Sequence, residues 1–119
     1  MIELIEATIE EQEKITEIMT ASFNYDTAFY FGKDATDGPE GYSDGSLATK
    51  ILTDATSQTW LISYQGEIAG FLTIDSQKWE VQYFCLFPLF INQGLGTKTW
   101  EKIEERFGHR PWFLETPAY

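Results

Sequence analysis

The first part of the chain combines a short apolar strand with an amphipathic helix. Residues 2–7 form an apolar segment that predicts a strand, and Thr8 is a good N-cap for a following helix, with Glu11 at capping-box spacing. Apolar residues then recur at helical spacing: Ile15, Ile18, Met19 and Phe23. We therefore predict a helix from about Ile9 to Asn24. After a long glycine-rich loop, of the kind that often shapes a binding site, residues 46–53 predict a short second helix.

From Thr59 onward the apolar positions change to the pattern of strands. Three segments rich in β-branched and aromatic residues follow one another, separated by turn-prone Gln-Gly and Asp-Ser pairs: residues 59–65, 67–75 and 78–87. This pattern predicts a three-stranded antiparallel meander.

The last strand of the meander runs through Pro88 into the sequence INQGLG and then into a helix from Gly94 to Phe107. Gly108 is placed to end that helix, and residues 111–116, PWFLET, predict one more strand. A strand–helix–strand crossover joins parallel strands, so this last strand should lie parallel to the third strand of the meander. The predicted fold class is α/β (α+β): a mixed, mainly antiparallel sheet flanked by helices, in the order β-α-(α)-β-β-β-α-β. We expect a single domain over residues 1–119.

Composition narrows the classes of function. The 119-residue chain is 43% hydrophobic, so it can bury a core, and its formal net charge is −11. That charge repels nucleic acids and anionic membranes, so we expect neither as a partner. The single cysteine, Cys85, is expected to be buried and forms no intrachain disulfide, and the amino terminus lacks the pattern of a signal peptide. We therefore expect a cytoplasmic protein whose pockets favour cationic substrates.

The candidate chemistry lies in residues 92–97, NQGLGT, where a strand ends and a helix begins. The first amides of a helix have no intrahelical acceptor and carry the positive end of its dipole, and glycine lets a phosphate approach closely. Such a turn can hold a pyrophosphate even on an acidic protein. The alternative is a tight connection in which glycine only turns the chain. The P-loop and Rossmann patterns do not match, because Thr97-Lys98 follows Gly96 and a third Rossmann glycine is missing.

The element order, with this turn after the meander, resembles the GNAT superfamily of acetyl-CoA-dependent N-acetyltransferases. The signature of that family is Arg or Gln, two variable residues, then Gly-x-Gly or Gly-x-Ala, after a strand that ends near a proline. Pro88 and the two glycines fall in register with it, whereas Ile91 stands at the Arg/Gln position. The resemblance implies that the main chain of Leu86 and Phe87 holds the pantetheine arm and the acetyl carbonyl. It also implies that coenzyme A pyrophosphate binds backbone amides of Asn92, Gln93, Gly94, Leu95, Gly96 and Thr97.

Glu80 is the candidate general base. Histone-type members of the superfamily carry a glutamate at this distance before the two glycines, and a carboxylate beside a cleft can take the proton of an ammonium before its nitrogen attacks a thioester. Strand alternation is expected to place Glu80 on one face together with Gln82, Phe84 and Leu86. The alternative is an ordinary solvated glutamate at the start of a strand.

The resemblance implies direct transfer of an acetyl group from acetyl-CoA to a primary amine of a small molecule or peptide, without a metal ion. The acidic residues of the long loop also lack the spacing of metal ligands. Two other interpretations stay open: a non-catalytic GNAT-like module that binds acyl-CoA or a protein partner, and an α/β interaction domain without a ligand. Family members usually continue past the strand at residues 111–116. The edge of that strand is therefore expected to need a partner, for which a second copy in a homodimer is a candidate.

Overall fold

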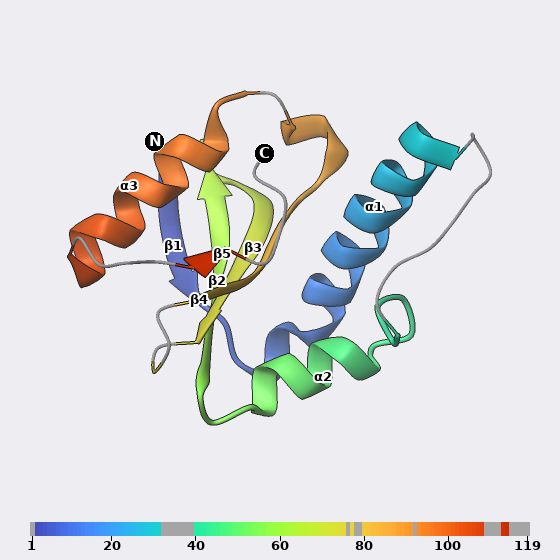
Figure 1. Ribbon diagram of the computed structural model, residues 1–119, viewed down its shortest axis with the longest axis horizontal. Helices are drawn as coiled ribbons and strands as arrows, with labels where there is room; N and C mark the ends of the chain where they lie inside the picture. Colours follow the sequence, from blue (N-terminus) through green and yellow to red (C-terminus); the bar gives the residue numbers. More distant parts are fainter. Residues whose placement is uncertain are drawn as a thin grey trace.

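A computed structural model of the chain describes residues 2–31, 40–75, 77, 80–91, 93–108 and 113–114, with side chains for all of these except 26–31 and 113–114. These residues form one strand, two helices, three consecutive strands, a third helix and a last strand (Figure 1). In chain order the elements are β1 (Ile2–Glu6), the 3₁₀ turn η1 (Ile9–Glu11), α1 (Gln12–Phe31), α2 (Ser46–Thr53), β2 (Ser57–Tyr64), β3 (Glu67–Asp75), β4 (Glu80–Leu86), the 3₁₀ turn η2 (Pro88–Phe90), α3 (Leu95–Phe107) and β5 (Phe113–Leu114).

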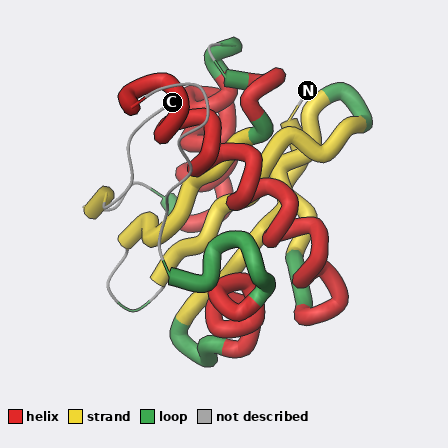
Figure 2. The backbone as a smooth tube through the Cα atoms, turned by 90° about the vertical axis from the view of Figure 1, so that its right-hand side faces the viewer, coloured by secondary structure: helices red, strands yellow, loops and turns green. Residues whose placement is uncertain are grey.

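The described strands form one sheet in the order β1-β2-β3-β4-β5. Neighbours from β1 to β4 pair antiparallel, and β5 pairs parallel with β4. The strands lie side by side in Figure 2, with the helices packed against them. The predicted meander, the parallel last strand and the mixed fold class are therefore confirmed.

Helices cover both faces of the sheet and bury one apolar cluster on each (Figure 1). The first, which we call the α3-side cluster, contains the buried residues Ile2, Trp60, Ile62, Ala69, Leu72, Ile74, Val81, Leu86, Phe90, Leu95 and Ile103. The second, the α1/α2-side cluster, contains Ile15, Ile18, Met19, Leu47, Ala48, Ile51, Leu61, Phe71 and Cys85. Cys85 is 3% exposed, which confirms its predicted burial.

Two cation–π contacts hold α3 along β2. The Lys98 ammonium lies 5.4 Å from the centre of the Tyr64 ring, and the Arg106 guanidinium lies 5.6 Å from that of Trp60. From Lys98 to Arg106 the helix rises about 12 Å, and from Tyr64 back to Trp60 the strand spans about 13 Å. Both contacts therefore fit α3 running antiparallel to β2. Gly108 then ends the helix as predicted, with a φ of 79°.

α1 extends further than its apolar pattern predicted. Thr8 caps the first turn, η1, by accepting a hydrogen bond from the Glu10 amide at 3.3 Å, which confirms the predicted N-cap. The helix then runs to Phe31 rather than ending near Asn24. The sequence has no glycine or proline before Gly32, and the weak helix formers in between cost less than about 1 kcal/mol each. Among the described residues, no helix is long and apolar enough to cross a membrane.

Candidate active site

The glycine turn leaves the first backbone amides of α3 outside the helical hydrogen bonds. Gly94 is the N-cap residue, and its carbonyl accepts the first helical bond from the Lys98 amide at 3.3 Å. The amides of Leu95, Gly96 and Thr97 precede that bond. No side-chain hydrogen bond caps this end of the helix in the described part of the chain, and Gly94 and Thr97 are exposed. The turn therefore places three amides at the positive end of the α3 dipole, of which those of Gly96 and Thr97 belong to accessible residues, whereas Leu95 is 1% exposed.

Glycine at position 94 is required by the backbone conformation there and not by a lack of space for a side chain. Its φ is 73° and its ψ is 15°, in the left-handed region, yet a Cβ placed there would meet no atom within 4 Å. The neighbouring Gln93 turns its side chain back, so that its Nε2 donates to the Leu89 carbonyl at 2.9 Å. Asn92 lies outside the described residues. The space in front of the turn is thus left open by the side chains that are described.

Ile91, at the position of Arg or Gln in the GNAT signature, packs half-buried against the α3-side cluster. Two residues that the sequence analysis missed adjoin the turn instead. The Tyr64 ring contacts Phe90, just before the turn, with 6.4 Å between ring centres, and it also lies under the ammonium of Lys98. The only sequence signal was the position of Lys98, four residues after Gly94.

A bulge in β4 changes which side chains share a face. Glu80 pairs with Asp75 and Val81 with Ile74, but the next pair is Tyr83 with Thr73, so Gln82 is an extra residue. The buried residues sort accordingly: Val81, Phe84 and Leu86 contact the α3-side cluster, whereas Tyr83 and Cys85 contact the α1/α2-side cluster.

The prediction that Glu80, Gln82, Phe84 and Leu86 share one face is therefore wrong. Glu80 pairs with Asp75, which is four residues after Phe71 on β3 and so lies on the α1/α2 face. Gln82 lies on that face too, because its Oε1 accepts a hydrogen bond from the Ser57 hydroxyl at 3.0 Å. The half-buried Glu80 consequently stands directly opposite the buried carboxylate of Asp75, away from Phe84 and Leu86.

The described residues of β5, Phe113 and Leu114, pair with the start of β4. The ladder joins Glu80 to Phe113 and Val81 to Leu114, and in the described residues the rest of β4 has only β3 as a strand neighbour. At the far end the Phe87 amide donates to the Ala69 carbonyl on β3 at 2.8 Å. Because successive amides of a strand point to opposite edges, the Leu86 amide points away from β3. At the predicted site, Leu86 rather than Phe87 therefore directs its amide away from β3.

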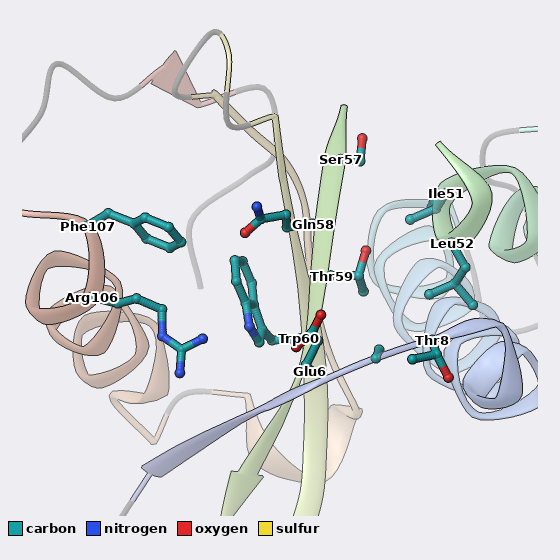
Figure 3. Close-up of a pocket in the computed structure, with 11 residues that line it drawn as sticks. Glu6, Thr8, Ile51, Leu52, Ser57, Gln58, Thr59, Trp60, Arg106 and Phe107 are labelled. Carbon is teal, nitrogen blue, oxygen red and sulfur yellow. The ribbon is translucent and has the colours of Figure 1, made fainter. Parts of the chain in front are cut away.

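A cavity of about 500 Å³ lies at the other end of the sheet, where β1 leaves β2 (Figure 3). Trp60 and Arg106 line it on the α3 side, and Ile51 and Leu52 lie across β2 from them. None of the predicted site residues contributes to it. Nor, in the described part of the chain, do three or more His, Cys, Asp or Glu side chains gather as a metal site requires. The glycine turn and the Leu86 amide that points away from β3 remain the features that match the predicted chemistry.

Comparison with known proteins agrees with this geometry. Residues 12–116 match the acetyltransferase (GNAT) family. Among curated proteins no sequence matches significantly.

Solved structures show the same fold at low sequence identity. An acetyltransferase from Thermus thermophilus superposes with a TM-score of 0.68 at 14% identity, over 95% of this chain and 74% of that one. The PaiA N-acetyltransferase from Thermoplasma acidophilum, in complex with coenzyme A, gives 0.63 at 19% identity, over 91% and 74%. An aminoglycoside acetyltransferase from an uncultured soil metagenomic sample, in complex with sisomicin, gives 0.57 at 13%, over 98% and 78%. With the family match covering most of its length, this chain belongs to the GNAT family and is a GNAT-type acetyltransferase.

Proposed function

We propose that this acetyltransferase moves the acetyl group of acetyl-CoA directly to a primary amine, within the single domain of residues 1–119. The observation that carries the proposal is the uncapped start of α3 at Gly94, together with the Leu86 amide that points away from β3 at the end of β4. A pyrophosphate needs the first feature, and an extended pantetheine arm needs the second. The match to the GNAT family supports this use of both.

The residues present fit coenzyme A. The amides of Leu95, Gly96 and Thr97 would hold the pyrophosphate, with Asn92, Gln93 and Gly94 completing the turn. The first turn of α3 carries no acidic side chain that would repel it. Leu86 would donate its amide to the arm or to the acetyl carbonyl. Contrary to the initial expectation, Phe87 would not donate its backbone amide to the arm, because that amide already donates to the Ala69 carbonyl. The Phe87 carbonyl accepts a hydrogen bond from the Phe90 amide at 2.9 Å.

Glu80 would serve as the base on the acceptor side. An ammonium must lose a proton before its nitrogen lone pair can attack, and Glu80 would take that proton directly or through water. The new C–N bond then forms as the C–S bond breaks, and the departing sulfur leaves as a thiolate that gains a proton. The thioester is already activated, so the chain needs only to bind, orient and deprotonate the amine, and no metal is required.

The acceptor we propose is a cationic amine, as part of a small molecule or a basic peptide. The net charge of −11 attracts cations, and two acidic residues, Glu80 and Asp75, occupy paired positions on one face of the sheet at the start of β4. The similar aminoglycoside acetyltransferase, solved with sisomicin, is consistent with this class. We also propose a cytoplasmic setting, where a lone buried cysteine stays reduced, and a homodimer as one way to cover the edge of β5.

A thiol-release assay over a panel of amines tests the transfer. Glu80→Gln should lower the rate roughly 100-fold, as expected when a general base is lost. Glu67→Gln, an exposed glutamate at the other end of β3, is the matched control and should behave like the wild type. Equal rates and pH profiles for the two variants would exclude Glu80 as the base.

A second candidate function is a non-catalytic module that binds acyl-CoA. The apolar Ile91 at the Arg/Gln position of the signature favours it. Coenzyme A binding by calorimetry, without thiol release for any amine of the panel, would support the module over the enzyme. Absence of binding at millimolar coenzyme A would contradict both.

A further inference from the structure

Lys98 is an exposed cation in the first turn of α3 of this acidic protein. The chain has 8 basic against 19 acidic residues, and two of the described lysines, Lys14 and Lys102, make ion pairs with glutamates on their own helices. Lys98 is exposed and rests instead on an aromatic ring, that of Tyr64. A cation held by a ring keeps its charge available to an anion, whereas one paired with a carboxylate does not.

The position of Tyr64 fixes Lys98 beside the glycine turn. The same ring contacts Phe90 before the turn and Lys98 after it, so it lies alongside the residues that connect η2 to α3. Lys98 is one helical turn after Gly94, and helical side chains lean back toward the amino terminus of their helix. Its side chain therefore leans toward the first turn of α3, which carries the amides of Leu95 and Gly96.

Lys98 is the basic residue of α3 nearest the positive end of the helix dipole. It lies in the first turn, which has no acidic side chain, whereas Lys102 and Arg106 lie further along the helix among Glu101, Glu104 and Glu105. A positive charge at this end weakens the empty helix, and a bound anion at its amino terminus would remove the penalty. The arrangement thus favours an anion at the turn by a second physical effect, independent of the open amides.

We propose that Lys98 is the side-chain cation that holds the pyrophosphate of coenzyme A at this turn, in place of the Arg or Gln of the signature that Ile91 replaces. The inference rests on the proposed function, because it assumes that coenzyme A binds at the turn. A lysine binds phosphate as a mobile point charge, so it can act from the helix, whereas the side chain at position 91 is apolar and packs half-buried against the α3-side cluster. Tyr64 positions Lys98, and Lys98 neutralises the anion that the acidic surface otherwise repels.

Calorimetry with coenzyme A on three variants tests this proposal. Lys98→Gln should weaken binding roughly tenfold at low salt, as for loss of a charge-assisted contact, and Lys98→Arg should restore most of the affinity. Lys102→Gln is the matched control, because it removes the same charge one turn further along and from an existing pair with Glu105 at 3.6 Å. Its effect should stay within about twofold, and the tenfold effect of Lys98→Gln should shrink to about threefold at 0.5 M NaCl.

Dephospho-coenzyme A, which keeps the pyrophosphate and lacks the 3′-phosphate, tests the assignment to the pyrophosphate. Lys98→Gln should cost the same factor with either ligand. If the cost disappears with dephospho-coenzyme A, or if Lys98→Gln and Lys102→Gln weaken coenzyme A equally, the proposal is overturned while the proposed function stands. If the wild-type chain does not bind coenzyme A, both are overturned. Equal melting temperatures of the three variants would show that the comparison concerns binding and not folding.

Discussion

Replacing Gly94 by alanine isolates the backbone geometry of the glycine turn from its packing. A Cβ at this position meets nothing within 4 Å, so the whole cost comes from holding an L residue at a φ of 73°. That conformation costs about 1–2 kcal/mol, and alanine recovers about 0.4–1 kcal/mol by restricting the unfolded chain. The net loss should be about 1 kcal/mol, which lowers the melting temperature by about 4 °C in a domain of this size.

Gly66→Ala is a matched control for this perturbation. Gly66 has a φ of 82°, and a Cβ there also meets nothing within 4 Å, but it lies in the hairpin between β2 and β3. Both variants should therefore lose the same stability in thermal or urea unfolding. Only Gly94→Ala relaxes the turn that aligns the amides of Leu95, Gly96 and Thr97.

Coenzyme A binding should separate the two variants. Loss of one well-aligned hydrogen bond to a charged group costs about 1.5–3 kcal/mol, so Gly94→Ala should bind coenzyme A roughly 10- to 100-fold more weakly than Gly66→Ala. Gly94→Asn should recover part of the affinity, because asparagine tolerates the left-handed region. Equal affinities for the two alanine variants, at equal stability, would show that the turn does not hold the pyrophosphate.

Three further predictions concern stability. Thr99→Val should stabilise the protein by about 1 kcal/mol in urea unfolding, because the buried Thr99 hydroxyl has no hydrogen-bond partner among the described residues; no gain would indicate a partner that the structure does not describe. Gly70→Ala should lower the free energy of unfolding by about 2 kcal/mol or more, because its Cβ would collide with the Cys85 carbonyl across β3 and β4. A loss of stability smaller than that of Gly66→Ala would contradict this packing. Hydrogen bonds from the amide and hydroxyl of Thr56 lower the pKa of Asp54 below its ordinary 3.8, so the stability that this carboxylate contributes is present above pH 3.8 and is lost as the pH falls below it. Melting curves of the wild type and Asp54→Asn should therefore differ at pH 6 and converge toward pH 2, and a gap that persists in acid would refute the assignment.

Local sequence patterns determined most of the fold. The alternation of β2 and β3, the turn pairs between them and the helical spacing in α3 each act over a few residues, so the periods predicted the elements and their order. The handedness and crossover rules then predicted a parallel last strand, and Gly108 marked the end of α3. The position of the candidate turn at Gly94 followed from the same kind of local signal, a glycine at the end of a helix. Its left-handed φ is the conformation that glycine adopts more readily than other residues.

The tertiary structure determined which side chains and backbone groups of those elements face one another. The bulge at Gln82 depends on the ladder that β3 offers, so no period within β4 could show that Glu80 faces away from Leu86. The hydrogen bond from the Phe87 amide to the Ala69 carbonyl is equally non-local, and it leaves the backbone amide of Leu86 as the candidate donor. The contact between Tyr64 and Lys98 joins residues far apart in the chain. Each of these depends on pairing across the sheet, whereas the sequence patterns report only interactions between near neighbours in the chain.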